Sequence, residues 1–306
     1  MKKIVISIIN FNGEKQTTAC LDSLSSIVKK GYEIYVRIID NNSQIPFQID
    51  SKRYPLLNIS VFNSDKNTGF SGGHNVGISY AQSINADYIL ILNNDTTVDK
   101  NFCLKLFEVI EPRKDVVAVV PKIYFSPGQE FHATTYTKND RGKVIWYAGG
   151  KMDWNNVVGY HVGVDEVDKG QFNDIVSTEF ATGACVLIDM GVLKKSGKFD
   201  EKYFLYYEDN DLCMRLKKYG EILFVPNSII WHDNAGSTGG SGSNLQDYFI
   251  SRNRMLFGMR YAPIRTKMAL VRESFRILMT GRKWQKRGIK DFYLRKFGKG
   301  TYPLSK

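Results

Sequence analysis

DYILILNND, residues 87–95, is the stretch that decides the fold of this chain. Its central residues, Ile89 to Leu92, form an uninterrupted apolar run too short for a typical helix. Such a run is typical of a strand that is buried on both faces, as in a parallel sheet covered by helices. The run ends in Asn93, Asn94 and Asp95, so polar side chains are predicted at the carboxyl end of this strand.

The first half of the chain alternates between strand and helix patterns. Strands are predicted at 4–9, 33–40, 57–63 and 87–95, and helices at 14–30, 72–83 and 101–111. This alternation predicts an α/β fold with a mostly parallel sheet between two layers of helices. Ligands bind such sheets beyond the carboxyl ends of the strands. Polar residues lie at three of these ends, Asn10–Asn12, Asp40–Ser43 and Asn93–Asp95, and we expect one crevice to gather them.

The second half is less regular. Residues 126–172 predict loops and short strands, 174–188 a return to strand, and 209–219 a helix. Residues 222–232 predict two short strands broken at Pro226, because proline cannot donate a ladder hydrogen bond. A short GSTGGSGS loop at 236–243 precedes a region predicted to be helical to its end.

Composition narrows the class of protein. The 306 residues are 43% hydrophobic and 24% charged, which is ordinary for a globular protein. No run of eighteen apolar residues is present, and the N-terminal apolar run, 4–9, is too short for a signal peptide, so we expect a cytosolic protein. The four cysteines are far apart without a CxxC pair, which predicts buried free thiols rather than a zinc or redox site.

The charge is concentrated in the C-terminal region. The net charge is +11, and residues 252–306 hold 16 Lys and Arg against two Asp and Glu. Aromatic and aliphatic residues are interleaved with these cations, a composition that favours amphipathic helices on an anionic membrane. The alternatives are an ordinary helical subdomain or a dimer interface. Nucleic-acid binding is disfavoured because no recognised binding motif accompanies the charge.

Three carboxylates crowd the segment FLYYEDNDLCMRL, residues 204–216: Glu208, Asp209 and Asp211. Like charges repel and lose hydration on burial, so such a cluster is costly to the fold. One of them is a candidate general base for a hydroxyl proton. The alternative is an acidic helix N-terminus, which the helix dipole favours. The dipole lowers the pKa of a carboxyl, crowding raises it, and the sequence leaves the outcome open.

Four other motifs each have two interpretations. Asp40 either caps its own turn or accepts a hydrogen bond from a pyrimidine base. NTGFSGGHNVG, 67–77, is either a plain loop or a glycine-rich turn that brings backbone amides to a ligand. Asp95 is either a turn residue or a ligand for a divalent cation that also binds a diphosphate. His232 is structural unless the fold brings it to Asp95.

Seven ordered blocks resemble family 2 glycosyltransferases of the GT-A fold, particularly the bacterial rhamnosyltransferase-like branch. They are VISIINFNG, DNNS, NTGFSGGHNVGI, ILNNDT, ATGACVLI, GKFDEKYFLYYEDNDLCMRL and WHDNAGST. The resemblance implies a Rossmann-like GT-A domain over 1–243, with a nucleotide-binding half at 1–120 and an acceptor half at 121–243. The basic helical region, 244–306, follows it.

The resemblance also implies roles for individual residues. Asp209 matches the catalytic base, with Glu208 as second choice. Asp95 and His232 match metal positions for Mn²⁺ or Mg²⁺. Gly183, Ala184 and Cys185 match a segment that faces the acceptor. The residues matched to nucleotide-sugar binding are Asn10, Phe11, Asn12, Asp40, Asn67, Gly69, Gly72, Asn75, Asn93, Asn94 and Asp95. Arg252 and Arg254 are further candidates for the diphosphate, against the alternative of salt bridges on a solvated helix.

The activity implied is inverting transfer of a sugar to a lipid-linked glycan acceptor in bacterial surface polysaccharide synthesis. The expected donor is dTDP-L-rhamnose, with a UDP-hexose, a UDP-N-acetylhexosamine or UDP-galactofuranose as alternatives. The expected location is the inner face of the cell membrane, peripherally bound, with a homodimer through the C-terminal helices as another use of that region. Two alternatives belong to other classes of protein. A sugar nucleotidyltransferase would need a glycine-rich basic loop directly after the first strand, and residues 12–14 do not form one. The other alternative is a non-catalytic module that binds a membrane or a carbohydrate.

Overall fold

The computed structural model describes residues 1–233 and 242–303. Its strands are β1 (Lys2–Asn10), β2 (Tyr32–Asp40), β3 (Asn58–Asn63), β4 (Tyr88–Asn93), β5 (Thr96–Val98), β6 (Val116–Phe125), β7 (Ile145–Tyr147), β8 (Gly150–Asp153), β9 (Val158–His161), β10 (Val176–Ser177), β11 (Cys185–Asp189) and β12 (Glu221–His232). Its α-helices are α1 (Glu14–Leu24), α2 (Gly69–Ser83), α3 (Phe102–Ile110), α4 (Met190–Ser196), α5 (Glu208–Leu216), α6 (Asn244–Tyr261), α7 (Ile264–Thr280) and α8 (Lys283–Tyr293).

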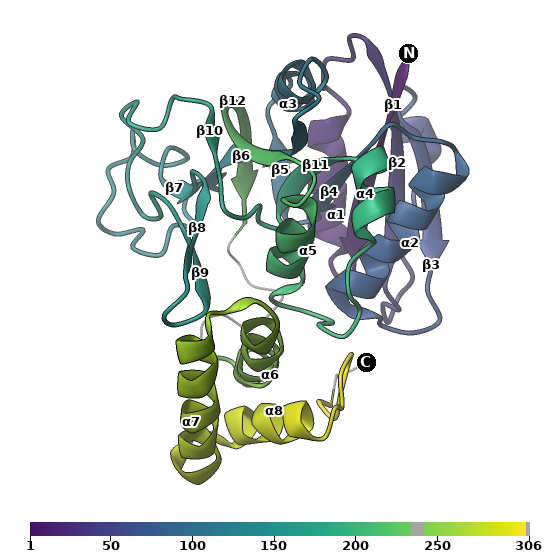
Figure 1. Ribbon diagram of the computed structural model, residues 1–306. Coiled ribbons are helices and arrows are strands. Elements are labelled where there is room, and N and C mark those ends of the chain that lie inside the picture. The colour runs from purple at the N-terminus through teal and green to yellow at the C-terminus, as the bar shows by residue number, and fades with distance from the viewer. Residues whose placement is uncertain (234–241, 304–306) are drawn as a thin grey trace.

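The central sheet is the mixed, mostly parallel sheet of an α/β fold. Its strand order is β10-β12-β6-β11-β4-β1-β2-β3, with β5 beside β12 and β7 beside β6 (Figure 1). The pairs β1–β2, β1–β4, β2–β3 and β6–β12 are parallel, whereas β11 is antiparallel to both neighbours. Residues Ile89–Leu92 of β4 are fully buried, as expected for a strand covered on both faces.

Several predicted elements have different bounds. The helix predicted at 14–30 ends at Leu24, and only 176–177 and 185–188 of the segment 174–188 are strand. The break predicted at Pro226 is wrong, because β12 continues from Glu221 to His232. The ladder with β6 skips from Val225 to Ile229, so Pro226 lies in a bulge where no ladder hydrogen bond is required.

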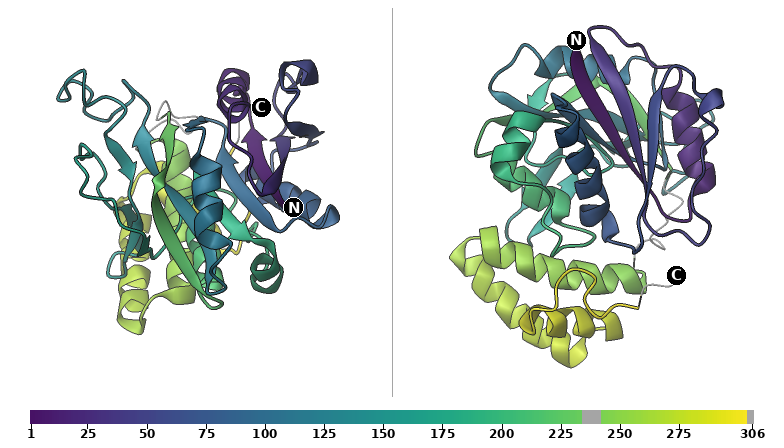
Figure 2. Two further views of the ribbon diagram at one scale, coloured as in Figure 1. Left: turned by 90° about the horizontal axis from the view of Figure 1, so that it is seen from above. Right: turned by 90° about the vertical axis from the view of Figure 1, so that its right-hand side faces the viewer.

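The three C-terminal helices form a layer beneath the carboxyl ends of the central strands (Figures 1 and 2). The layer is joined to the body by aromatic packing, and the ring of Phe249 stacks on that of Phe204 with centroids 5.2 Å apart. Within the described residues, no helix is both long enough and apolar enough to cross a membrane. The four cysteines are buried free thiols, as predicted.

Candidate active site

The strand tips lie side by side, as predicted. Asn10 and Asp40 are register partners at the ends of β1 and β2, and the Asn10 amide donates to Asp40 Oδ2 at 2.8 Å. Thr17 at the start of α1 donates to Asn10 Oδ1 at 2.8 Å and accepts from Asn94 Nδ2 at 3.0 Å. Hydrogen bonds therefore connect the carboxyl ends of β1 and β2 directly, and Thr17 of α1 links them to the end of β4.

Asp40 is buried and shapes the turn that follows β2. Its carboxylate accepts hydrogen bonds from the backbone amides of Ser43 at 2.9 Å and Phe47 at 3.1 Å, in addition to the Asn10 amide. Asn12, in the left-handed region with φ +52°, accepts from the Gln44 amide. The turn interpretation of Asp40 is thus confirmed, and the partly exposed Phe11 lies on the same rim.

His232 is brought to Asp95 by strand pairing, which sequence spacing did not reveal. β12 pairs with β5 so that His232 lies opposite Thr96, and His232 Nε2 lies 3.3 Å from Asp95 Oδ1. Asn93 Nδ2 lies 3.5 Å from the same imidazole nitrogen. Asp95 Oδ1 is buried without a hydrogen-bond partner among the described residues. Burial raises the pKa of Asp95, and the charge of His232 partly offsets this.

This pair is suited to a divalent cation. The buried carboxylate oxygen without a hydrogen-bond partner is a ligand of the kind that Mn²⁺ and Mg²⁺ prefer, and an imidazole nitrogen lies next to it. Over residues 1–233 and 242–303, no group of three or more His, Cys, Asp or Glu side chains is placed to hold a metal. Two protein ligands leave positions open for phosphate oxygens and water.

Trp146, which the sequence analysis missed, packs on His232 and is itself contacted by His161. The Trp146 ring, on β7, stacks on the His232 imidazole with centroids 4.5 Å apart and an interplanar angle of 23°. His161 lies edge-on to the Trp146 ring, with ring centroids 4.4 Å apart. The Nδ1 of His161 donates a hydrogen bond to the Trp146 carbonyl. Burial lowers the pKa of His161 to about 4, so it is neutral at pH 7. No local motif identifies Trp146 or His161, because β7 and β9 join the site only in the folded chain.

The two carboxylates at the start of α5, Glu208 and Asp209, are both buried and have raised pKa values. Glu208 is buried, its Oε2 has no partner within the described chain, and burial together with Asp209 raises its pKa well above the usual value. Burial also raises the pKa of Asp209, although hydrogen bonds from Asn210 and Gly183 oppose it. Burial therefore outweighs the helix N-terminus, which resolves the conflict left open by the sequence.

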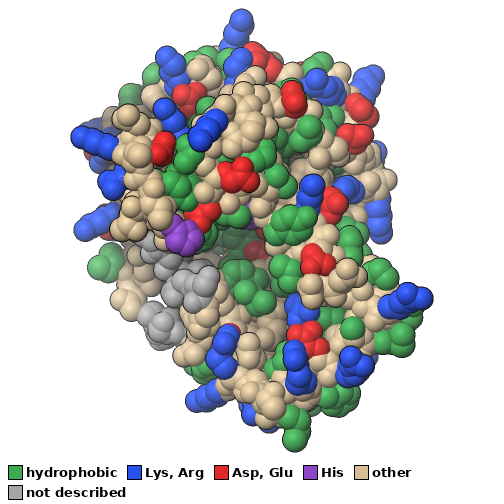
Figure 3. Space-filling view, turned by 90° about the vertical axis from the view of Figure 1, so that its left-hand side faces the viewer, with side chains coloured by type: hydrophobic (Ala, Val, Ile, Leu, Met, Phe, Trp, Pro, Cys, Tyr) green, Lys and Arg blue, Asp and Glu red, His purple; other side chains and the backbone are tan. Residues whose placement is uncertain are grey.

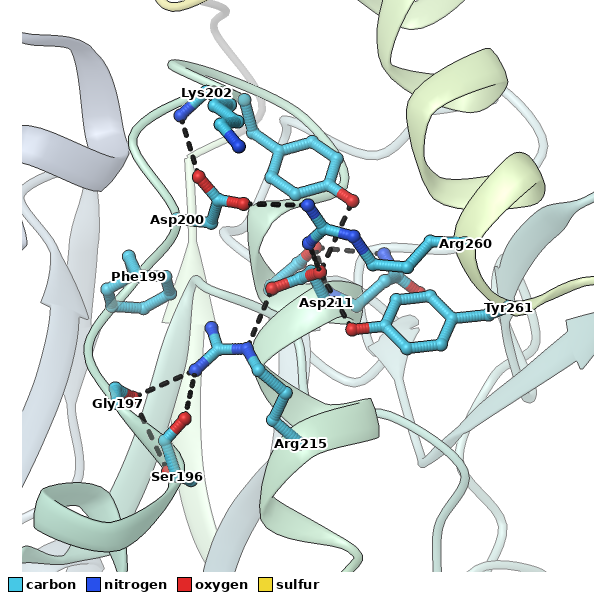
Figure 4. A network of polar contacts seen from close by, with 12 residues as sticks. Ser196, Gly197, Phe199, Asp200, Lys202, Asp211, Arg215, Arg260 and Tyr261 are labelled. Atoms are coloured by element: carbon cyan, nitrogen blue, oxygen red, sulfur yellow. Dashed lines mark hydrogen bonds and ion pairs between the residues drawn. The ribbon is translucent and has the colours of Figure 1, made fainter.

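Asp211 has a structural role instead. It is fully buried and accepts hydrogen bonds from Arg215 of α5 and from Arg260 and Tyr261 of α6 (Figure 4). Arg260 also forms an ion pair with Asp200 at 3.0 Å. Asp211 thus joins α5 to the C-terminal layer, and its charge is compensated without a ligand.

The turn before α5 is held in an unusual backbone conformation. Phe204, Tyr206 and Tyr207 all have φ between +67° and +70°, which bulky residues rarely adopt. Each such residue costs about 1–3 kcal/mol, and this cost is met by the surrounding structure. The amide of Asn253 on α6 donates to the backbone carbonyls of Tyr203, Leu205 and Tyr206.

The segment Gly183–Ala184 connects the acidic cluster to the strand tips. The Gly183 amide donates to Asp209 Oδ2 at 3.2 Å, and the Ala184 carbonyl accepts from the Asn93 amide at 2.9 Å. A Cβ on Gly183 would lie 2.6 Å from the tip of the Phe70 ring, so a larger residue here would displace that ring. Cys185 does not face an acceptor, which corrects the prediction: it is fully buried in β11.

The glycine-rich segment serves packing rather than anion binding. α2 begins at Gly69, and the amides of Phe70 and Ser71 both donate to the Phe204 carbonyl, at 2.8 and 3.3 Å. A Cβ on Gly69 (φ +70°) would lie 2.3 Å from that same oxygen, and one on Gly72 would lie 2.5 Å from Thr68 Cβ. The first free amides of the helix are thus already occupied by the chain.

Asn67 and Asn75 are also engaged within the protein. Asn67 Oδ1 accepts from the Gly69 amide and from Asn41 Nδ2. Asn75 donates to the Phe199 carbonyl and accepts from the Phe199 amide. Both side chains are half-exposed, and their placement beside a ribose or diphosphate stays a prediction.

The two arginines of α6 are likewise corrected. Arg252 is fully buried, and its five N–H groups donate to Asn253 Oδ1 and to the carbonyls of Lys202, Tyr203, Lys296 and Gly298. Arg254 donates to the Asn156 carbonyl and pairs with Glu273 at 3.0 Å. The salt-bridge interpretation is confirmed for Arg254. Arg252 links parts of the chain through buried hydrogen bonds and has no N–H group left to donate to a diphosphate.

Comparison with known families assigns the chain to one of them. The family model for glycosyl transferase family 2 matches residues 5–195, which include β1 to β11. The chain belongs to glycosyl transferase family 2. The seventh block of the predicted resemblance, WHDNAGST, extends beyond Asp233, and its last five residues lie outside the described part of the chain.

Several curated relatives are similar at low identity. The low-salt glycan biosynthesis hexosyltransferase Agl10 of Haloferax volcanii is 22% identical over 214 residues, covering 70% of this chain and 61% of that protein. Rhamnosyltransferase WbbL of Escherichia coli is 22% identical over 230 residues, covering 73% and 80%. The N-acetylglucosaminyl-diphospho-decaprenol L-rhamnosyltransferase of Mycobacterium tuberculosis is 42% identical over 59 residues, 19% of each chain. This chain thus spans about three-fifths of the first of these relatives.

Two solved structures share the fold. GalNAc-T7, crystallised with UDP, GalNAc and Mn²⁺, aligns with a TM-score of 0.60 at 16% identity, covering 96% of this chain and 58% of that one. Staphylococcus aureus TarS 1–349 in complex with UDP-GlcNAc aligns with a TM-score of 0.56 at 15% identity, covering 95% and 80%. The GT-A fold predicted from the sequence is therefore confirmed.

Proposed function

We propose that this chain is an inverting glycosyltransferase that uses a nucleoside-diphosphate sugar. The observation that carries the proposal is the connection between Asp209 and the strand tips through Gly183 and Ala184. It joins a carboxylate with a raised pKa to the edge where Asp95 and His232 lie. Group transfer from a diphosphate donor needs both a base for the acceptor and a site for the leaving group.

Each half of the crevice has its own task in this proposal. Asp209 accepts the proton of the acceptor hydroxyl as that oxygen attacks the anomeric carbon and the bond to the diphosphate breaks. Its raised pKa makes it a stronger base than an exposed aspartate. Gly183 fixes its orientation through the backbone amide.

The strand-tip half binds the donor. Asp95 and His232 would hold Mn²⁺ or Mg²⁺, and such an ion, when bound, neutralises charge on the departing diphosphate. Phe11, Asn12 and the turn shaped by Asp40 lie at the rim where the base and ribose would be held. Asn10, Asn93 and Asn94 support that rim through the hydrogen bonds between strands.

The names of the relatives support a proposal for the donor and the acceptor. Two of them are called rhamnosyltransferases, and the name of one specifies an N-acetylglucosaminyl-diphospho-decaprenol acceptor. We infer dTDP-L-rhamnose as donor and a lipid-linked glycan as acceptor, in surface polysaccharide synthesis at the inner face of the membrane. A UDP-hexose, UDP-N-acetylhexosamine or UDP-galactofuranose donor would leave the assigned chemistry unchanged.

The test is Asp209→Asn, with Glu208→Gln as the matched neighbour. Asparagine keeps the shape of the side chain but cannot accept the proton, so transfer should fall by about 10²–10⁴. Donor binding, measured by calorimetry with Mn²⁺, should remain close to that of the unmodified chain. Glutamine at 208 imitates a protonated glutamate, so its effect on transfer should be much smaller.

The readout is nucleoside-diphosphate release across a panel of sugar nucleotides, with and without Mn²⁺ or Mg²⁺, in the presence of a membrane-lipid extract. Full release by the Asp209→Asn variant would overturn the base assignment. A larger loss in Glu208→Gln than in Asp209→Asn would transfer that role to Glu208.

A further inference from the structure

Helix α7 carries an exposed row of apolar side chains. Ile264 is 70% exposed, Met268 61%, Phe275 59% and Met279 78%. Spacings of four, seven and four residues place them along one face of the helix. The opposite face contains Leu270, Thr266 and Ser274, which are buried. The row is thus an unpartnered face of a helix whose other face is packed.

The charges around this row are of one sign. Arg265, Arg272 and Arg276 are exposed on α7 beside it. Glu273 is the only acidic residue between Ile264 and Thr280, and it pairs closely with Arg254 of α6 at 3.0 Å and more loosely with Arg276 at 3.8 Å. The acidic group is therefore drawn toward α6, and the outward face presents apolar and cationic groups together.

Helix α8 extends the same surface. Tyr293 stacks on Phe275 with ring centroids 6.3 Å apart, and both Tyr293 and Leu294 are exposed. Exposed cations follow at Lys290 and in the segment 295–296. By contrast, Phe257 and Leu270, which belong to the same basic region, are buried in the core of this layer. The apolar side chains of this region thus divide into an exposed set on α7 and α8 and a buried set in the core of the layer.

We propose that the outward face of α7, continued by Tyr293 and Leu294, lies in the interface of an anionic lipid bilayer. Apolar side chains enter the acyl boundary while flanking cations meet lipid phosphates. A second copy of the chain is a poorer occupant, because two such faces would bring Arg265, Arg272 and Arg276 against like charges. A nucleic acid would leave the apolar row uncovered.

This inference deepens the proposed function and rests on it only for the identity of the acceptor. The C-terminal layer lies beneath the carboxyl ends of the central strands, and the surface is hollowed between that layer and the body (Figure 3). A bilayer on the outward side of α7 would hold the crevice near the surface from which a lipid-linked acceptor comes. The docking itself requires no chemistry.

The experiment is co-sedimentation of the full chain with vesicles of phosphatidylglycerol and phosphatidylcholine, compared with phosphatidylcholine alone. Ile264→Gln, Met268→Gln and Met279→Gln together should lower binding about tenfold or more, because glutamine keeps helix propensity but removes the apolar contact. The matched control, which changes three exposed apolar residues elsewhere, is Leu56→Gln, Phe131→Gln and Ile175→Gln.

A second set tests the cations. Arg265→Gln, Arg272→Gln and Arg276→Gln should lower binding about fivefold each, or on the order of 100-fold together. Its control removes the same charge far from α7, with Lys114→Gln, Lys138→Gln and Arg141→Gln, and should retain binding to within about twofold. Far-UV circular dichroism of every variant establishes that the fold is kept.

Equal losses in the variants and their controls would overturn the proposal, as would no preference for anionic vesicles. A dimer in sedimentation that the α7 variants convert to monomers would assign the face to a second copy instead. Nucleotide release on the same preparations separates the two proposals. A chain that binds vesicles without releasing nucleotide supports docking and counts against the chemistry. Release without vesicle binding overturns docking alone.

Discussion

At the scale of single residues, burial decides what each carboxylate does. Glu208 and Asp209 are neighbours at the start of α5, yet only Asp209 has a backbone amide from another element directed at it. Glu208 Oε2 has no partner in the described chain. A buried carboxyl without compensation takes a proton rather than remain charged. The sequence could predict the cluster, but not this division, because the difference depends on Gly183, which is 26 residues away.

The raised pKa of Glu208 predicts how stability changes with pH. Its pKa in the folded chain lies above the unfolded value, so the folded state holds the proton more tightly. Stability from this group is fully present below the unfolded pKa and is lost as pH rises through the folded pKa. Glu208→Gln removes the titration. Relative to the unmodified chain, the variant should therefore become progressively more stable above about pH 4.3.

The measurement is the free energy of urea unfolding at a series of pH values for both proteins. Asp95 and Asp209 also have raised pKa values, but they are common to both chains and largely cancel in the comparison. A constant difference between the two chains across the series would show that Glu208 does not titrate abnormally. If the variant instead lost stability relative to the unmodified chain as pH rises, the pKa of Glu208 would be lowered by folding, which contradicts the prediction.

At the scale of elements, the strands were predictable and their partners were less so. Apolar runs located β1, β2 and β4, and their polar tips predicted one edge. Nothing local predicted that β5 would pair with β12 and bring His232 to Asp95, or that β7 would add Trp146. The left-handed backbone conformation of the Phe and Tyr residues before α5 could not be predicted either, because these residues normally avoid positive φ. The site therefore depends on long-range packing more than the fold does.

The junction of α5 with α6 predicts a large effect for Asp211→Asn. The carboxylate accepts from Arg215 at 2.9 Å and from Tyr261 at 2.9 Å, and it faces Arg260 as well. Removing the charge leaves two guanidinium groups without their buried partner, so the free energy of unfolding should fall by about 3–5 kcal/mol.

Asp200→Asn is the matched control for this junction, and urea titration is the measurement. Asp200 contacts the same Arg260 but is partly exposed, so its loss should cost about 0–1 kcal/mol. Equal effects of the two substitutions would show that the network is no stronger than a surface ion pair. Figure 4 shows why we expect otherwise, because Asp211 lies at the centre of the contacts and Asp200 at their edge.

At the scale of the whole molecule, the C-terminal helices contact the body across the division that the sequence predicts at residue 243. Composition changes there, but the contacts across it are extensive. Asn253 holds the strained turn before α5, and Arg252 donates to carbonyls of Lys202 and Tyr203. Phe249 stacks on Phe204, whose carbonyl caps α2. The turn before α5 is thus held by the C-terminal helices, which charge patterning alone did not indicate.

A chain truncated to residues 1–243 should therefore not behave as an independent folded domain. It would lose Arg252, Asn253 and Phe249, so nothing from α6 would offset the cost of the unfavourable backbone conformation at Phe204–Tyr207, and we expect the turn to lose that conformation. We expect a lower and broader thermal transition in far-UV circular dichroism, and Asn253→Ala in the full chain should shift the midpoint in the same direction. Donor binding should weaken in both, since Phe204 caps the helix that packs beside the strand tips. An unchanged midpoint in the truncated chain would mean that the turn keeps its shape without α6, and the boundary at 243 would then be a true domain boundary.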